Sequence, residues 1–185
     1  MKAADFYSRI VKPTLTLMAE LPEIKLPVSD KAAVLTMTCA GQESGWAARR
    51  QIGIGQYYPQ SVGARGYWQF ESTWGGPVAI NDVQQKTPKQ LAAVCAYLEI
   101  PTDELALYEA IAWNDTLACA IARLLLWTDP NPLPAIGDKT GSWNYYLRNW
   151  RPGAPHPETW SARYDAALAA IGSDTRQNVL DLGGA

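Results

Sequence analysis

Apolar residues recur every three or four positions along most of the chain, which is the pattern of helices with one buried side. Such a helix is predicted over residues 5–18, with a bend or a restart at Pro13. From Asp30 to Gln42 the apolar residues surround more than one side of the helix. This stretch therefore predicts a buried central helix, for which Ser29 is a good N-cap.

Two further helices are predicted in the middle of the chain. The segment Thr87-Pro88-Lys89-Gln90 combines a capping box with proline at the first helical position, and its helix should end before Pro101. Either Thr102 or Asp103 should open the next helix. A helical pattern of this density predicts a mainly α fold.

The C-terminal third predicts two more helices. Asn114 can cap the most apolar helix of the chain, which we expect to be core scaffold with no site on it. The last helix should run from about Glu158 to a C-cap at Gly172, with a frayed tail beyond Ser173.

Three segments interrupt the helical pattern. Residues from Trp46 to Val62 predict a long loop or a small irregular pair of strands, and 73–77 predict another turn. Asp129 to Ser142 is rich in proline and glycine and is expected to be a loop. We find no repeat, linker or second domain, so residues 1–185 are predicted to form a single domain.

Composition narrows the range of partners. The net charge is −2 and no basic run is present, so neither nucleic-acid binding nor attachment to an anionic membrane is expected. We expect a monomer. The eight tryptophans suit a carbohydrate-binding groove, although core filling should account for at least half of them.

The N-terminus has no apolar run typical of a signal peptide, and no later stretch is apolar and long enough to span a bilayer. We therefore expect synthesis in a cytoplasm without a recognisable export signal. Cys39, Cys95 and Cys119 fall on apolar helical faces, which predicts buried, reduced thiols. The sequence implies no metal and no cofactor, and its single histidine excludes a histidine-rich zinc site.

The first candidate for chemistry is Glu43, in the last turn of the predicted central helix. Counting back by helical steps reaches Ala40, Cys39 and Leu35, so the face that carries the acid is otherwise apolar. Burial would disfavour the carboxylate and raise its pKa, as a proton donor near neutral pH requires. Gly45 can end the helix and leave the acid at the edge of a cleft. The alternative is an ordinary solvated glutamate at a helix end.

The second candidate is the segment from Gly63 to Glu71. Its two glycines permit a tight turn, and Tyr67-Trp68-Gln69-Phe70 places aromatic rings beside an amide. Sugars bind aromatic surfaces through their C–H faces, while amides bind hydroxyl and N-acetyl groups. Gln69 is therefore predicted to contact substrate, and Trp68 and Phe70 to face the core on one side and a cleft on the other.

Together, Gln42-Glu43-Ser44-Gly45 and Gly63-Ala64-Arg65-Gly66-Tyr67-Trp68-Gln69 resemble the paired motifs of lysozyme-like lytic transglycosylases and goose-type lysozymes. The second motif has Tyr-Trp where that superfamily has Leu-Met. The resemblance implies a lysozyme-like helical domain with a small irregular or β loop region beside the cleft. It also implies cleavage of peptidoglycan between N-acetylmuramic acid and N-acetylglucosamine, with Glu43 as general acid.

The resemblance leaves the second catalytic group open. Glu71 stands where goose-type lysozymes carry an aspartate thought to position water, although it could equally compensate the dipole of a nearby helix. If Glu71 activates water, the enzyme inverts and the two carboxyls should lie about 6.5–9.5 Å apart. Ser44 could hold Glu43 by a hydrogen bond or simply cap the helix. Tyr145 and Tyr146 are loose substitutes for the tyrosine of the transglycosylases.

Hydrolysis by a phage muramidase is the favoured reading, as an endolysin or a virion component that acts on the periplasmic wall. The first alternative is a transglycosylase, in which the substrate's 6-hydroxyl attacks and forms 1,6-anhydromuramic acid. More remote alternatives are a chitinase, a wall peptidase using Cys39 and His156, and a wall-binding module without turnover.

Overall fold

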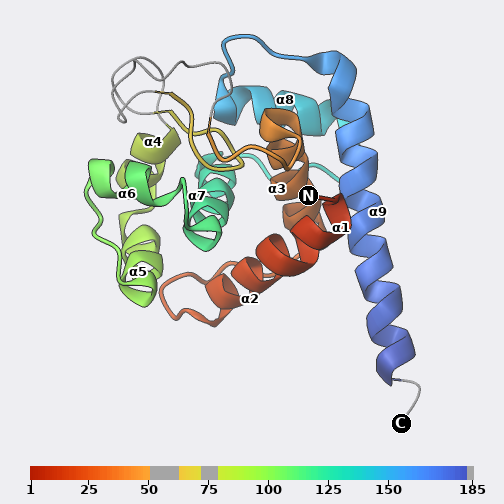
Figure 1. The fold of residues 1–185 in the computed structure, drawn as a ribbon, viewed down its shortest axis with the longest axis horizontal. Coiled ribbons are helices and arrows are strands. Elements are labelled where there is room, and N and C mark those ends of the chain that lie inside the picture. Colours follow the sequence, from red (N-terminus) through yellow and green to blue (C-terminus); the bar gives the residue numbers. More distant parts are fainter. Residues whose placement is uncertain (51–62, 72–78, 183–185) are drawn as a thin grey trace.

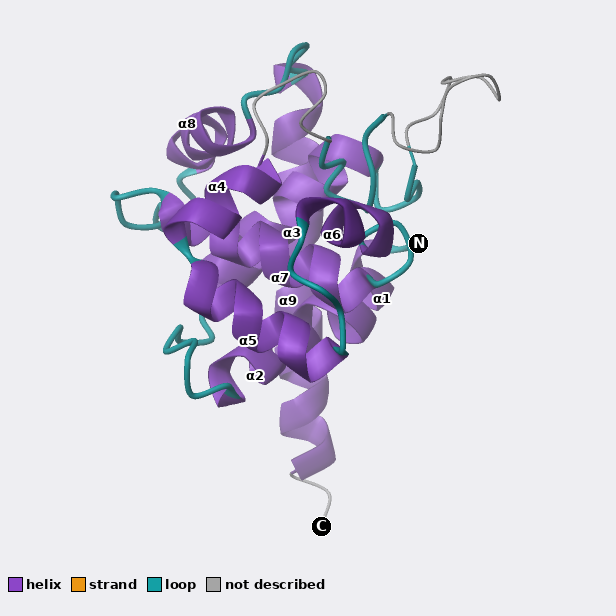
Figure 2. Ribbon diagram, turned by 90° about the vertical axis from the view of Figure 1, so that its left-hand side faces the viewer, coloured by secondary structure: helices purple, strands orange, loops and turns teal. Residues whose placement is uncertain are grey.

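The computed structural model describes residues 1–50, 63–71 and 79–182, and no side chain after Asp174. The described part is mainly helical, which confirms the predicted class (Figure 2). Its helices are α1 (Ala3–Phe6), η1 (Tyr7–Val11), α2 (Lys12–Glu20), α3 (Asp30–Ser44), α4 (Ala79–Lys86), α5 (Pro88–Leu98), α6 (Glu104–Ala110), α7 (Asp115–Thr128), α8 (Lys139–Trp150) and α9 (Pro157–Leu182).

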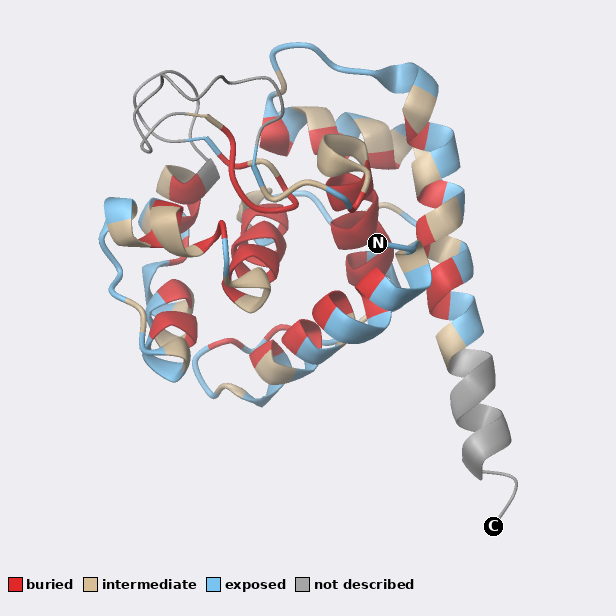
Figure 3. Cartoon of the chain, in the orientation of Figure 1, coloured by how far each residue is buried: buried red, intermediate tan, exposed pale blue. Residues whose placement is uncertain are grey.

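Two helices, α3 and α7, form the centre of the core. Every residue from Ala32 to Gly41 in α3 and from Leu117 to Leu126 in α7 is buried (Figure 3). The prediction of a buried central helix is thus confirmed. Helix α9 packs along α3, while α4 and α5 pack on α7 at the other side of the molecule (Figure 1).

Within the described ranges, β structure is limited to two isolated antiparallel bridges, Arg50 with Arg65 and Arg65 with Phe70. These bridges give the short segment after Gly63 its shape. Most of the predicted loop, residues 51–62, lies outside the described residues, and so does the turn at 73–77.

The N-terminal helix does not stop at Pro13 but changes its hydrogen-bond pattern just before it. Residues Tyr7–Val11 form one π-helical segment, and the N–H of Lys12 donates to the carbonyl of Tyr7, five residues back. Proline has no N–H and crowds the carbonyl four residues earlier. Widening the preceding turn relieves that conflict while α2 continues to Glu20.

Side-chain caps set most of the helix starts that the sequence predicted. The Ser29 hydroxyl accepts from the N–H of Ala32 at 3.3 Å. Asp103 accepts from Ala106 at 3.0 Å, and Asn114 accepts from Leu117 at 2.9 Å. These caps satisfy N–H groups that a helix start leaves without a partner, and all were readable from the sequence.

The prediction of a capping box at Thr87 is wrong. Pro88 does open α5, but the Thr87 hydroxyl donates to the carbonyl of Val83 at 2.7 Å and caps nothing in α5. Helix α4 ends at Lys86, so the Thr87 hydroxyl lies within reach of the carbonyls in the last turn of α4 and bonds one of them.

Two boundaries in the C-terminal third also differ from prediction. The loop predicted to extend to Ser142 ends earlier, because Asp138 caps α8 by accepting from Gly141 at 2.8 Å. Helix α9 continues through Gly172 to Leu182 instead of ending there. The 2.8 Å ion pair between Lys12 and Asp174 holds the turn after the glycine against the N-terminal helices.

The three cysteines are buried and free, as predicted. Among the described residues no single helix is long and apolar enough to cross a bilayer. Helices α6 and α7 reach that length and apolar composition only when they are taken together, and the chain bends by 119° between them.

Gly41 in α3 is required by a close contact with Trp46. A methyl group at Gly41 would lie 2.5 Å from a carbon of the Trp46 ring, and that ring is anchored by its Nε1, which donates to the Met37 carbonyl at 3.0 Å. We expect Gly41→Ala to lower the free energy of unfolding by about 1–3 kcal/mol. Gly172→Ala is the matched control, because nothing lies within 4 Å of the added carbon.

The control should raise the free energy of unfolding by about 0.5–1 kcal/mol, since alanine is the better helix former. Urea denaturation of both variants measures these changes. Equal stability of Gly41→Ala and the parent protein would show that the ring moves freely, contrary to this packing.

Candidate active site

Glu43 lies in the last turn of α3, where the helix ends at Gly45. Gly45 adopts a left-handed φ of 60°, and its N–H donates to the Gly41 carbonyl at 3.0 Å. The Glu43 side chain is half-buried, at the point where the buried part of α3 gives way to a partly exposed end. The acid therefore stands at the boundary between core and solvent, as its apolar helical face predicted.

A tyrosine from another helix holds the Glu43 carboxyl. The hydroxyl of Tyr146, in α8, donates to Glu43 Oε1 at 2.6 Å. The Tyr146 ring is buried, with its centroid 5.9 Å from that of Trp150 and 5.1 Å from that of Trp160. Trp143 lies 5.3 Å from the Tyr146 ring and 5.2 Å from Trp160. We call Trp143, Tyr146, Trp150 and Trp160 the aromatic wall.

Burial raises the pKa of Glu43 from 4.5 to about 7. The hydrogen bond from Tyr146 opposes this shift because it stabilises the carboxylate, and the negative charge of Glu71 adds to it. Burial and the charge of Glu43 also raise the pKa of Tyr146, so its hydroxyl stays a donor. The site thus holds a carboxyl that exchanges a proton near neutral pH.

Contacts around Gln42 fix the end of α3 against the start of α9. The Gln42 amide donates to the His156 carbonyl at 2.9 Å, and its oxygen accepts from the Thr159 hydroxyl at 2.9 Å. One turn further along α9, the Arg163 guanidinium lies 5.3 Å from the centre of the Trp46 ring. These contacts hold the last turn of α3, which carries Glu43, against α9.

The segment from Gly63 to Glu71 forms a tight turn beside the acid. Arg65 and Phe70 exchange two backbone hydrogen bonds of 2.9 Å, and the Phe70 ring stacks on Trp150 at 6.0 Å. Gln69 adopts a left-handed φ of 50°, and its side-chain nitrogen donates to the Gly66 carbonyl at 2.8 Å. Strained backbone of this kind often occurs at functional sites.

Glu71 is the last residue of this segment and is exposed. Its charge reaches Glu43 strongly enough to contribute to the raised pKa there. Two carboxyl groups in different surroundings, one half-buried and one in solvent, are the usual basis for separate acid and base roles.

Three of the predicted substrate-binding side chains lie in the core. Trp68 is fully buried and its Nε1 donates to the Thr36 carbonyl at 2.8 Å. Tyr67 is buried with its ring against Phe6, and the buried Tyr145 donates to the Leu126 carbonyl at 2.7 Å. All three rings are buried by the protein itself, so the structure offers none of their faces to a sugar.

Two other predicted residues keep polar groups near the acid. Ser44 donates to the carbonyl of Ala40 at 3.0 Å, so it caps its own helix and does not bond Glu43. Gln69 is partly exposed, and among the described residues no donor bonds its side-chain oxygen. Of the aromatic residues that the sequence predicted to bind substrate, Tyr146 alone bonds Glu43 in the described part of the chain.

Sequence reasoning missed Trp143 and Trp160 as part of the site. Trp143 and Trp150 flank Tyr146 at helical spacing, which could have indicated one aromatic face of α8. Nothing local indicates Trp160, because its place beside Tyr146 depends on how α9 packs.

The cysteine and histidine of the peptidase alternative are poorly placed for catalysis. Cys39 is completely buried, and burial raises the pKa of its thiol well above the usual range. A substrate cannot reach it, and a thiolate is disfavoured there. The His156 ring is exposed and pairs with Glu158 at 3.0 Å. In the described residues, no group of three or more histidine, cysteine or acidic side chains could hold a metal ion.

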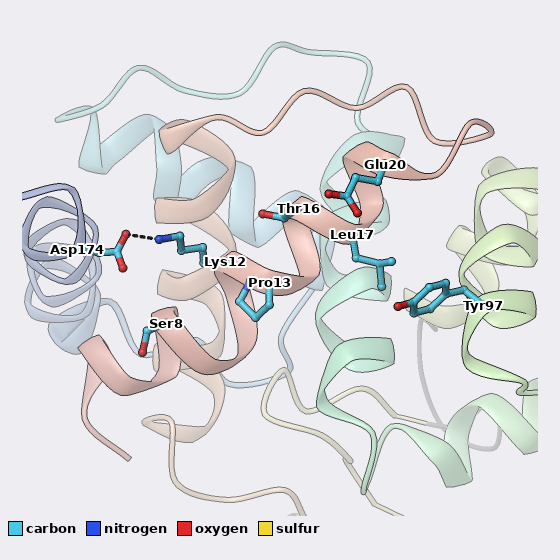
Figure 4. A pocket seen from close by; sticks show the side chains of 8 residues that line it. All are labelled: Ser8, Lys12, Pro13, Thr16, Leu17, Glu20, Tyr97 and Asp174. Carbon is cyan, nitrogen blue, oxygen red and sulfur yellow. Dashed lines mark hydrogen bonds and ion pairs between the residues drawn. The ribbon is translucent and has the colours of Figure 1, made fainter. Parts of the chain in front are cut away.

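A groove of about 500 Å³ lies elsewhere on the molecule (Figure 4). Residues of η1 and α2 form its floor, with Tyr97 at one end and the Lys12–Asp174 ion pair at the other. None of the candidate residues lines it, and its mixed walls present no convergent chemistry.

Comparison of the chain with models of known protein families, with curated proteins and with solved structures finds no match.

The raised pKa of Glu43 links stability to pH. A folded-state pKa above the unfolded value makes stability complete below about pH 4.5 and progressively lower as the pH rises to about 7. Glu43→Gln should remove this loss. After allowance for solvent screening, we expect the variant to exceed the parent by about 2 kcal/mol at pH 8 and to equal it at pH 4.

Denaturant titrations at the two pH values provide the measurement. Glu20→Gln, at an exposed position, is the control and should match the parent at both. A Glu43→Gln variant no more stable than the parent at pH 8 would contradict the burial of this carboxyl.

Proposed function

We propose that this protein is a lysozyme-like glycosidase that cleaves the glycan strand of peptidoglycan between N-acetylmuramic acid and N-acetylglucosamine. The observation that carries the proposal is the Glu43 carboxyl, whose pKa is raised to about 7 beside the exposed Glu71. The motifs around these two residues resemble those of lytic transglycosylases and goose-type lysozymes, and the mainly helical fold is compatible with that resemblance.

Cleavage of a glycosidic bond needs a proton on the leaving oxygen as positive charge develops on the sugar. Glu43 is the proton donor in this proposal, because about half of the protein molecules carry a protonated Glu43 at a pH near its pKa of about 7. Once the proton has left, the Tyr146 hydroxyl stabilises the new carboxylate through its 2.6 Å hydrogen bond. Tyr146 is thus a positioning residue for the acid in both protonation states.

Glu71 is the proposed base that activates water on the other side of the scissile bond. Its exposure gives water access to it, and its effect on Glu43 puts the two groups within electrostatic reach. A water placed between two such carboxyls leads to inversion at the sugar carbon. Gln69, with its free side-chain oxygen in the described part, is the proposed contact for an N-acetyl or hydroxyl group.

A lytic transglycosylase is the second candidate, and the hydrogen bond between Tyr146 and Glu43 favours it. That enzyme class uses a tyrosine near the cleaved bond and one glutamate as acid and then base. The substrate's own 6-hydroxyl would replace water, and Glu71 would then have only an electrostatic role.

The biological setting follows from the same proposal. Glycan strands of peptidoglycan are the proposed partner, and the proposed role is bacterial lysis or wall penetration by a phage, as an endolysin or within a virion. A chitinase, a peptidase and a wall-binding module without turnover remain the alternatives that experiment must separate.

Mass spectrometry of the products released from purified peptidoglycan tests the proposal. An ordinary reducing muramic acid end identifies the hydrolase, and a product lighter by one water identifies the transglycosylase. We expect Glu43→Gln to lower the rate by about 10²- to 10⁴-fold, and the parent's rate to fall above about pH 7 as the acid loses its proton.

Cys39→Ala is the control and should keep full activity, because the buried thiol has no part in the chemistry. Full lysis by the Glu43→Gln variant, or release of peptides with intact glycan strands, would refute the proposal.

A further inference from the structure

Trp113 is the most exposed large apolar side chain in the described part of the protein, with 71% of its surface accessible. It occupies the turn between α6 and α7. Its backbone N–H donates to the Ala110 carbonyl at 2.9 Å, and Asn114 caps the following helix. The backbone is therefore fixed on both sides of the ring. Tryptophan is enriched at binding interfaces, because its indole combines a large apolar surface with a polar N–H group.

An arginine covers one face of this ring. The Arg50 guanidinium lies 4.9 Å from the centre of the Trp113 ring, and Arg50 is exposed. The cation–π contact restricts the Arg50 side chain, while its exposure leaves the guanidinium accessible to a ligand. The pair thus combines a flat apolar surface with a preorganised cation.

Charge pairing sets Arg50 apart from its neighbours. Arg49 makes a bidentate pair with Asp115 at 2.8 and 2.6 Å, and Arg65 pairs with Glu109 at 2.6 Å. Arg50 has no carboxylate partner in the described part of the chain. Its positive charge is therefore available to an external anion, on a protein whose net charge is −2.

The backbone bridges connect this pair to the candidate active site. Arg50 bridges Arg65, and Arg65 bridges Phe70, the residue before Glu71. Neighbouring strands lie about 4.8 Å apart, so two bridges place the backbone of Arg50 about 10 Å from that of Phe70. A substrate several sugars long that is cleaved beside Glu71 can reach this distance.

We propose that Arg50 and Trp113 bind the acidic stem peptide that a peptidoglycan strand carries, next to the site of cleavage. This inference rests on the proposed function and names a determinant of substrate choice within it. Stem peptides carry free carboxylates and small apolar side chains. The guanidinium would bind a carboxylate through two N–H groups, and the indole would cover the adjacent apolar atoms.

The proposal predicts that the protein distinguishes two forms of one polymer. Glycan strands that carry stem peptides should bind more tightly than the same strands after an amidase has removed the peptides. The stripped strands keep one lactyl carboxylate on each muramic acid, whereas chitin has no carboxylate. Neither polymer carries a stem peptide, so binding of both should be independent of Arg50. Added salt should weaken binding of the peptide-bearing strands more than binding of uncharged chitin, and Arg50→Ala should reduce this difference, because the contact involves exposed charges.

The experiment compares the dissociation constants of both strand preparations in a Glu43→Gln background, and the KM values with Glu43 intact. We expect Arg50→Ala to weaken binding of peptide-bearing strands by about fivefold and to leave stripped strands unchanged. Trp113→Ala should act in the same direction, and Arg50→Lys should have an intermediate effect, since lysine keeps the charge but not the planar fork.

Lys89→Ala is the matched control, because it removes one exposed positive charge on α5 and should change neither constant. Thermal unfolding confirms that each variant is folded. Equal binding of peptide-bearing strands by Arg50→Ala and its parent would overturn the inference. An equal loss on stripped strands would also overturn it, since the pair would then contact the glycan or its lactyl carboxylates and not the stem peptide.

Failure of the proposed function gives a different result. If the protein with Glu43 intact cleaves neither preparation, the glycosidase proposal falls, whatever Arg50 does. Should peptide-dependent binding through Arg50 persist in that case, the stem-peptide site stands on its own as a wall-binding site.

Discussion

The hydrogen bond between Tyr146 and Glu43 is the contact on which the arrangement of the site depends. It joins two side chains 103 residues apart in the sequence, so it exists only if α3 and α8 are both in place. Burial destabilises the ionised carboxylate, and the hydrogen bond from the tyrosine hydroxyl offsets part of this effect. The balance leaves an acid whose pKa is raised to about 7 rather than one that is permanently neutral or permanently charged.

Much of the remaining structure keeps these two side chains together. Buried small residues let α3 pass through the core, and Gly41 makes room for the Trp46 ring just before the helix ends. Gln42 fixes that end to α9, which also supplies Trp160 to the aromatic wall. Phe70 extends the wall to the turn that carries Gln69 and Glu71. The proposed role of Glu43 as a proton donor depends on such rigid surroundings, because they fix the position of the acid before reaction.

What the sequence predicted well was local. Ser29, Asp103 and Asn114 start helices because each side chain bonds an N–H group within three residues of itself. Glu43 was readable because helical periodicity alone places it above an apolar face. Tertiary packing decided the rest. Trp68 and Tyr145 belong to the core because backbone carbonyls from α3 and α7 take their polar hydrogens. Helix α9 continues past Gly172 where it packs on the N-terminal helices, and Lys12, far away in the sequence, pairs there with Asp174.

The protonation state of Glu43 is the central claim, and carbon-13 NMR of the protein labelled at its glutamate carboxyls measures it directly. The Glu43→Gln variant assigns the signal. The structure predicts that this carboxyl titrates at about pH 7 while a solvated glutamate titrates near 4.5. A Glu43 signal that titrates with the solvated glutamates would contradict the account, because the carboxyl would then be fully ionised at neutral pH and have no proton to donate.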